Sequence, residues 1–393
     1  MNSPWLLAIA FVGFISLGLP DTVIGVAWPS VRETFGRHQS DLAAIFVGYG
    51  ISYFLSSFFT GRLLGWFGVG TLLTLSSAIV AVGVIGLGAS PVWIIFAFLP
   101  VLHGLGSGAI DAGLNHYVAR HFSAKQMNWL HACYSVGAML GPLIMTSVLA
   151  ANASWRSGYF TVGAILLILT ALFAFTRKQW NDPGTDSENS HEQPAVSAIE
   201  ALRNKAVVLQ SLFFFAYTGV EMTIGQWSFT VLTESRGLSE ESAGIWVTVY
   251  WASILVGRVV FGFVVERVGI DRLIRTGLLL ALLGTVLFSV RFDAAVIALP
   301  LIGLGLAPLY PCMMTRTPQR LGTGLAAHAI GFQVSAAMLG VTVLPSGCGF
   351  LAEWTSPNAI PIAAAGIAFV LFGINELLLR GDKVSRVRGA NPV

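Results

Sequence analysis

The chain has 393 residues, of which 55% are hydrophobic and 10% are charged, and its formal net charge is +3. Soluble domains carry about 25% charged residues, so this chain could not cover a water-facing surface. Three cysteines are too few for a secreted disulfide scaffold, and scattered basic residues disfavour a nucleic-acid-binding protein. The composition therefore indicates a protein that crosses a membrane many times.

A helix needs about 20 apolar residues to cross a bilayer, and twelve such runs follow one another along the sequence. The first run lacks a basic leading segment and is longer than a signal-peptide core, so we expect it to be retained. We predict spans at 5–29, 42–64, 70–89, 92–119, 128–150 and 157–176, then at 206–232, 242–265, 272–290, 294–315, 323–351 and 358–379.

Lysine and arginine are distributed unevenly between alternate gaps. With the N-terminus inside, most of the 22 basic residues fall in inner segments. The positive-inside rule then places both termini and the polar stretch 177–204 in the cytoplasm. We expect a multi-pass protein of the plasma membrane, which in a bacterium is the inner membrane, and we expect it to be a monomer.

The two sets of six spans repeat each other. Four matched pairs lie about 200 residues apart, half the chain length: Asp21–Gly25 with Glu221–Gly225, Gly104–Gly106 with Gly303–Gly305, Ala138–Gly141 with Ala337–Gly340, and Gly61–Gly68 with Gly262–Gly269. Parallel repeats of this kind are typical of transporters with a substrate site near the bilayer midplane. The predicted fold is an all-α integral membrane protein of twelve helices in two pseudo-symmetric six-helix bundles, 1–176 and 205–380, with a cytoplasmic linker at 177–204 and a tail at 381–393.

The last of these pairs resembles the loop motif of the major facilitator superfamily, which implies that fold and transport by alternating access. The acidic position of the motif is Gly65 in the first copy and Glu266 in the second. We therefore expect any gating salt bridge at the second copy. The loop residues that we single out are Gly61, Gly68, Gly262, Glu266, Arg267 and Gly269.

Three acidic residues fall well inside predicted spans, namely Asp21, Asp111 and Glu221. A charge at the bilayer centre costs about 3 kcal/mol on insertion scales, so such residues face the bundle interior and mark ion or substrate paths. We predict that they bind the coupling ion. The alternative is a carboxyl that stays protonated or serves the geometry of a broken helix, as Asp21 could after Pro20.

The fourth span carries a helical stripe of Gly104, Gly108, Asp111 and Asn115. Small residues at this spacing favour close packing against a neighbouring helix, so Asp111 and Asn115 should project inward, one turn apart. A carboxyl beside a carboxamide can hydrogen-bond a polyhydroxylated ligand while the carboxyl holds or releases a proton.

The segment Gly104–Val118 resembles the fourth helix of the fucose–galactose–glucose:proton symporter family, in which an acidic residue precedes an asparagine by four positions, as Asp111 precedes Asn115. Tyr217–Trp227 looks like the related sodium-dependent glucose transporters, and Gly303–Pro311 is similar to the symporters' tenth helix. The resemblance implies transport of a sugar-like solute with a coupling ion, H⁺ first and Na⁺ second, and no other cofactor.

Aromatic and amide side chains at interior depths complete the predicted substrate site, because aromatic faces stack on sugars and amides bind hydroxyls. Ordinary helix packing is the alternative for each of them. These candidates are Gln226, Trp227, Tyr134, Tyr310 and Gln333. No His, Cys or Asp spacing suggests a metal site.

Our leading hypothesis is a secondary transporter that imports a sugar or similar polar solute by cation symport. The alternative is a proton-coupled exporter of hydrophobic compounds, because Gly137–Pro142 looks like the signature of drug antiporters, although its trailing glycine pair is absent. Nothing in the sequence supports an enzyme. The expected partners are a small sugar-like molecule and the lipid bilayer, without nucleic acid.

Overall fold

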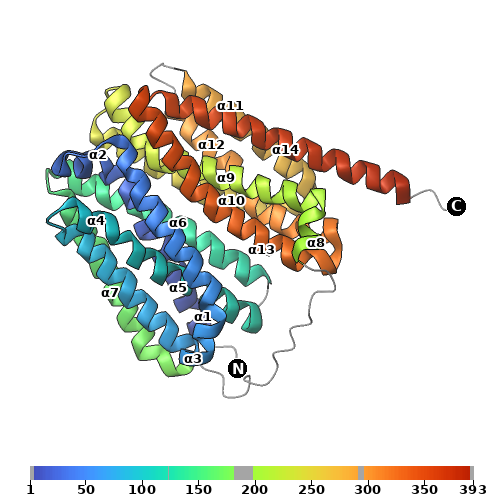
Figure 1. Cartoon of the computed structure of the whole chain (residues 1–393), viewed down its shortest axis with the longest axis horizontal. Coiled ribbons are helices and arrows are strands. Elements are labelled where there is room, and N and C mark those ends of the chain that lie inside the picture. Colours follow the sequence, from blue (N-terminus) through green and yellow to red (C-terminus); the bar gives the residue numbers. More distant parts are fainter. Residues whose placement is uncertain (1–3, 123, 181–197, 291–295, 390–393) are drawn as a thin grey trace. The chain divides into compact units, whose positions relative to one another are not determined.

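The computed structural model describes residues 4–122, 124–180, 198–290 and 296–389, and every element in these ranges is a helix (Figure 1). The first half of the chain forms α1 (Pro4–Asp21), α2 (Val23–Phe35), the short η1 (Gln39–Asp41), α3 (Leu42–Ala89), α4 (Trp93–Phe98), α5 (Pro100–His121), α6 (Ala124–Ala150), α7 (Trp155–Thr176) and η2 (Arg177–Gln179). The second half forms α8 (Ala198–Arg203), α9 (Lys205–Thr230), η3 (Val231–Ser235), α10 (Glu240–Val268), α11 (Ile270–Ser289), α12 (Ala298–Leu306), α13 (Leu309–Trp354) and α14 (Ala359–Gly389).

Eleven stretches of the described residues are long and apolar enough to cross a membrane. One of them, Gln39–Ala89, has 51 residues and contains both the second and the third predicted span. Gly68 divides it, with φ of 69° and ψ of 164°. The predicted all-α membrane fold is confirmed.

Three predicted spans are interrupted in the structure, in each case within two residues of a proline. The first breaks at Thr22 after Pro20, the fourth at Leu99 before Pro100, and the tenth at Ala307 before Pro308. Proline has no N–H to donate to the preceding turn, so one helical hydrogen bond is missing next to each break, while the backbone of Thr22, Leu99 and Ala307 stays in the helical region. The interruption at Thr22 is important for the site, because it directly follows Asp21.

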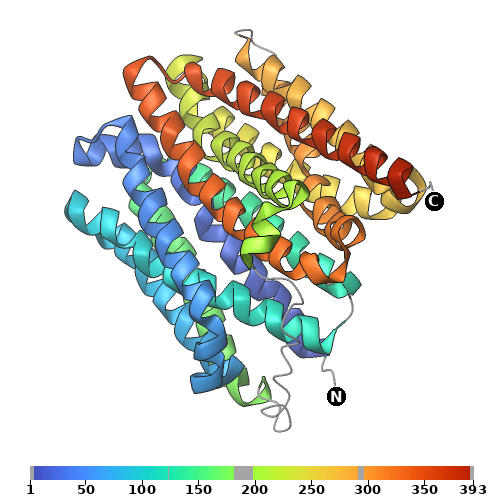
Figure 2. The ribbon, with the colours of Figure 1, turned by 45° about the vertical axis from the view of Figure 1, so that its right-hand side comes forward.

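By its contacts the chain divides into two compact units. Unit 1 consists of Met1–Glu188, Gly225–Ala252 and Gly349–Pro357, and unit 2 consists of Asn189–Ile224, Ser253–Cys348 and Asn358–Val393. Unit 1 thus holds the first half of the sequence together with short parts of α9, α10 and α13. Within unit 1, α3 packs along α5 and α7 while α1 packs along α6; within unit 2, α11 packs on α12 and α14 (Figure 2).

The packing of α1 on α6 in unit 1 is repeated by the packing of α9 on α13 in unit 2. Thr22 Oγ1 donates to the Ala138 carbonyl at 3.0 Å, and Thr218 Oγ1 donates to the Ala337 carbonyl at 2.7 Å. Thr22 also faces Gly141 just as Thr218 faces Gly340, and at both glycines a Cβ would collide with the partner helix. The internal repeat is therefore visible in three dimensions.

This packing corrects the sequence match of the first and seventh spans. The structural counterpart of Thr22 is Thr218, so the counterpart of Asp21 is Tyr217 and that of Gly25 is Glu221. The match of Asp21 with Glu221 was wrong by about four residues, roughly one helical turn. Asp21 and Glu221 therefore occupy different heights in the two repeats.

The loop motif keeps its equivalence. Gly68 and Gly269 both have positive φ, 69° and 86°, a conformation that favours glycine. Glu266 and Arg267 are exposed at the end of α10. An ion pair does form next to this loop, but Asp271 makes it, because its two carboxylate oxygens accept hydrogen bonds from Arg316 at 2.9 Å each.

Candidate functional site

Asp111 is held by two uncharged donors. Tyr53 of α3 donates its hydroxyl to Oδ2 at 2.7 Å, and Asn115, one turn further along α5, donates its amide to Oδ1 at 2.9 Å. All three side chains are partly exposed. The predicted pairing of Asp111 with Asn115 on one helix face is present, and Tyr53 completes it.

The glycine stripe explains why Tyr53 reaches Asp111. A Cβ at Gly104 would collide with the Tyr49 carbonyl of α3, and a Cβ at Gly108 with the Tyr53 carbonyl. The absence of side chains at both positions lets α5 lie directly on the α3 backbone. Small residues at this spacing therefore place a tyrosine hydroxyl beside the carboxylate.

Asp21 lies at the end of α1, where the helix is interrupted. Its Oδ2 accepts a hydrogen bond from the Tyr134 hydroxyl of α6 at 3.0 Å. Its backbone carbonyl accepts a hydrogen bond from the Gln226 amide at 2.7 Å. On the other side, His103 Nε2 lies 3.3 Å from Oδ1.

His103 was missed by our reading of the sequence. It lies on α5, is 6% exposed, and its ring packs against Tyr49 with centroids 4.8 Å apart. The signal that could have found it is its position: an ionisable side chain inside an apolar span indicates an ion or substrate path in the same way as a carboxylate.

We call these residues the unit 1 carboxylate cluster; they are Asp21, Tyr49, Tyr53, His103, Asp111, Asn115 and Tyr134. Asp21 is close enough to act on Asp111 electrostatically. Among the described residues, no lysine or arginine forms an ion pair with either carboxylate. The cluster therefore combines two acidic groups with neutral donors and one imidazole.

Glu221 has different surroundings, within unit 2. It accepts a hydrogen bond from the Tyr217 hydroxyl, one turn earlier on α9, and Arg258 Nη2 of α10 lies 3.6 Å from its Oε1. Arg258 Nη2 is also 3.4 Å from the Tyr217 hydroxyl. The negative charge of Glu221 thus has a positive partner beside it.

The remaining predicted substrate residues are divided between the units. In unit 1, Gln226 and Trp227 are buried, and the Trp227 ring fills the space beside Gly349. In unit 2, Tyr310 packs edge-on against Phe214 with centroids 5.0 Å apart. The structure brings Gln226 and Tyr134 to Asp21, and it places Tyr310 near Tyr217.

Gln333 belongs to a separate polar network inside unit 2. Its amide nitrogen donates to Thr317 Oγ1 at 2.9 Å and to Gln210 Oε1 at 3.2 Å, and Thr317 Oγ1 donates to the same Gln210 oxygen at 2.8 Å. All three side chains are fully buried. These bonds occupy the Gln333 amide.

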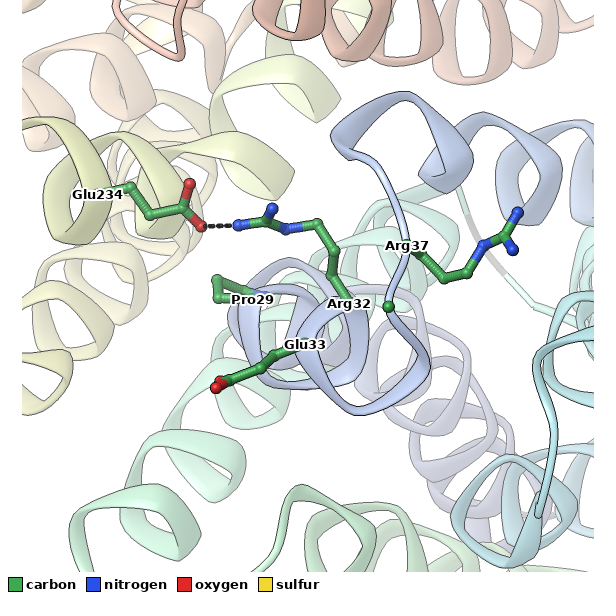
Figure 3. A pocket seen from close by; sticks show the side chains of 6 residues that line it. Pro29, Arg32, Glu33, Arg37 and Glu234 are labelled. Carbon is green, nitrogen blue, oxygen red and sulfur yellow. Dashed lines mark hydrogen bonds and ion pairs between the residues drawn. The ribbon is translucent and has the colours of Figure 1, made fainter.

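A second polar cluster in unit 1 surrounds η1, and we call it the η1 cluster (Figure 3). Arg32 extends to Glu234 at 2.8 Å while Arg37 points away from it, next to a pocket lined by Pro29, Arg32, Glu33, Gly36, Arg37 and Glu234. Gln39 donates its amide to Glu234 at 2.8 Å and its backbone N–H to Glu353 at 2.8 Å. It also accepts from the Trp28 indole at 3.0 Å. Gln39 thus connects η1 to α2, to η3 and to the end of α13.

The profile of the Major Facilitator Superfamily matches residues 10–345 and, in a second alignment, 211–391. The chain belongs to the major facilitator superfamily. As a member it is a transporter of a small molecule and not an enzyme, and it crosses the membrane several times.

Two curated relatives match most of the chain. "Sodium-dependent glucose transporter 1" of Homo sapiens is 23% identical over 383 residues, covering 86% of this chain and 72% of the relative. "Glucose/mannose transporter GlcP" of Bacillus subtilis is 22% identical over 408 residues, covering 100% and 97%.

Solved structures share the fold. The nucleoside transporter NupG superposes with a TM-score of 0.76 at 13% identity, covering 94% of this chain and 98% of that one. The E. coli fucose:proton symporter FucP superposes with a TM-score of 0.65 at 15% identity, covering 96% and 99%.

Proposed function

We propose that this transporter imports a sugar or similar polyhydroxylated solute together with a proton, by alternating access. The observation that carries the proposal is the setting of Asp111, a carboxylate inside the helical bundle whose hydrogen-bond partners are a phenol and a carboxamide. The names of the glucose and fucose transporters among its relatives agree with a sugar-like substrate.

Asp111 is suited to exchange a proton because protonation breaks no ion pair. A buried charge without a positive partner is expensive in a bilayer, so the free energy of the site falls when the carboxyl is neutral. Release of the proton into water on one side, and its capture on the other, can then be linked to the movement of the protein.

Asn115 and Asp111 together offer the substrate hydroxyls both a donor and acceptors. The Asn115 amide nitrogen already spans the Asp111 carboxylate and the Asp111 carbonyl, at 2.9 and 3.0 Å. A sugar hydroxyl that enters this site can replace one of these bonds with another of the same kind. Substrate binding therefore depends on Asn115 and coupling depends on Asp111.

Glu221, which we also predicted from the sequence to bind the coupling ion, is less suited to that role than Asp111. Neutralising Glu221 would break its ion pair with Arg258, and removal of one partner of a buried pair is strongly unfavourable. We propose that Glu221 and Arg258 act as a structural pair and that Asp21 and Asp111 provide the ion path.

The exporter alternative receives no specific support. The Gly137–Pro142 segment that suggested it lies where α6 packs on α1. A Cβ at Gly137 would collide with the Ile15 carbonyl, and one at Gly141 with the Leu19 carbonyl. Helix packing accounts for these glycines.

The setting that we propose is that of a monomer in the plasma membrane, with both termini and the 177–204 linker in the cytoplasm. The halves 1–176 and 205–380 would be the moving parts. The transporter would need no cofactor besides its coupling ion.

The test is uptake of a labelled hexose, deoxyhexose and polyol panel by proteoliposomes with an inward proton gradient. Accumulation that disappears when the gradient is collapsed is the expected result. In Asp111→Asn we expect accumulation to fall by about tenfold for a pH difference of about one unit, because one coupled proton is worth that factor. Counterflow exchange of the same solute should continue.

An inward sodium gradient is the control for the coupling ion, because the human relative is named a sodium-dependent transporter. Accumulation driven by sodium alone would refute proton coupling. No uptake under either gradient would refute sugar import and favour outward-pumping assays with hydrophobic compounds.

A further inference from the structure

One buried ionisable group of the unit 1 carboxylate cluster has no part in the function proposed above. The His103 side chain is 8% exposed and that of Asp21 is 10% exposed. Nε2 of His103 and Oδ1 of Asp21 face each other at 3.3 Å, and neither atom has a hydrogen-bond partner in the described structure. A proton on Nε2 would point at this free carboxylate oxygen.

Among the residues that the structure describes, no lysine or arginine forms an ion pair with Asp21. From α3, Tyr49 packs on the His103 ring, and its hydroxyl group also interacts with the Asp21 carboxylate. From α5, Asp111 acts on Asp21 electrostatically, and from α6, Tyr134 donates to the other Asp21 oxygen. The Gln226 side chain of α9 donates to the Asp21 backbone carbonyl. His103 is therefore the group that can balance the charge of Asp21.

The charge of the whole cluster depends on two protons. With Asp111 neutral and His103 positive, the positive imidazolium offsets the Asp21 carboxylate and the cluster has no net charge. With both protons released, two carboxylates remain unbalanced in the interior of the bundle. An unbalanced charge inside the membrane is unfavourable. The free-energy barrier to the conformational change that moves the cluster is therefore lowest when both protons are bound.

We propose that His103, paired with Asp21, carries a second coupling proton, so that two protons accompany each substrate molecule. This proposal rests on the proposed function, in which Asp111 carries the first. The second proton enters from water on one side, binds the imidazole against Asp21, and returns to water on the other side. No covalent bond other than the N–H bond forms or breaks.

The test is the equilibrium accumulation ratio in proteoliposomes, measured with the panel member that wild-type protein accumulates and with the membrane potential clamped at zero. For a pH difference of about one unit, two coupled protons give a ratio of about 100 and one gives about 10. We expect a ratio near 100 for the wild type and near 10 for His103→Gln. A merely structural role of His103 would slow uptake without changing this equilibrium ratio.

The matched control is His116→Gln, because His116 lies on the same helix but is exposed, and its ratio should equal that of the wild type. Asp21→Asn removes the partner of His103, so its accumulation ratio should also be about 10. This variant replaces His103→Gln as the test if His103→Gln shows no counterflow exchange. The double variant with Asp111→Asn should lose accumulation altogether.

A wild-type ratio near 10, or an unchanged ratio in His103→Gln, would overturn the second proton and leave the proposed function standing. No proton-driven accumulation by the wild type would instead refute the proposed function, and the second proton with it.

Discussion

Asp111 in unit 1 and Glu221 in unit 2 are both carboxylates on apolar helices, and each accepts a hydrogen bond from a tyrosine hydroxyl of its own unit. The two carboxylates differ in the second side chain that lies beside each of them. Asn115 stands beside Asp111, whereas Arg258 stands beside Glu221. Protonation of Asp111 breaks no ion pair, whereas neutralising Glu221 would break its ion pair with Arg258. An acidic residue inside a span therefore indicates a functional site only once its hydrogen-bond and ion-pair partners are known.

The largest expected effect comes from removing the positive partner in unit 2. Arg258→Leu removes the positive partner of the buried Glu221 carboxylate, and removal of one member of a buried ion pair typically costs about 3–5 kcal/mol of stability. Thermal unfolding in detergent should show a clear fall in Tm. Arg258→Leu combined with Glu221→Leu should recover most of it, and a single variant as stable as the wild type would contradict a structural pair.

A smaller effect is expected from replacing Tyr53, which donates a hydrogen bond to Asp111 in unit 1. Tyr53→Phe removes one of the two donors to Asp111, and a hydrogen bond to a charged group contributes about 1.5–3 kcal/mol. The ionised form of Asp111 loses more than the neutral form, so proton release becomes harder and the turnover of net uptake should fall. Counterflow exchange, which needs no net proton release, should fall less. Equal losses in both assays would mean that Tyr53 serves only packing.

The smallest effect is expected from replacing Asn115, whose side-chain amide lies beside Asp111. Asn115→Ala removes the proposed hydrogen bond to the substrate, with a net value of about 1 kcal/mol, and it also removes the amide donor to Asp111, so turnover should fall as in Tyr53→Phe. The apparent affinity for the transported solute should weaken by about fivefold, while the equilibrium accumulation ratio stays unchanged because Asp111 still couples the proton. Measurement of KM and of the accumulation ratio separates the two. An unchanged KM would exclude Asn115 from the substrate site.

Much of the fold followed from the sequence because long apolar runs leave few alternatives in a bilayer. The pairing of Asp111 with Asn115 also followed, because four residues make one helical turn. The contribution of Tyr53 did not, since it depends on how closely α5 approaches α3. The Glu221–Arg258 pair, about 40 residues apart in sequence, likewise needed the packing of α9 on α10.

The error in the internal repeat has a physical cause as well. A shared glycine and a nearby acid made Asp21–Gly25 look like Glu221–Gly225. The contacts that specify register are instead the threonine bonds of Thr22 and Thr218. In a glycine-rich chain, matching single residues by eye can misalign two helices by one turn. A hydrogen bond between two packed helices shows directly which residues are equivalent.

The η1 cluster has a consequence for the conformational equilibrium of the transporter. Gln39 belongs to the first half of the sequence, whereas Glu234 and Glu353, which accept its hydrogen bonds, belong to the second. If the solute passes on this face, these bonds and the Arg32–Glu234 pair must break in every cycle. Net values of about 1 kcal/mol each would hold the open population at about one part in a hundred to one in a thousand. Loss of the Gln39 amide alone would then raise that minor population several-fold, so the polarity of one short turn influences how often the transporter is accessible from this face.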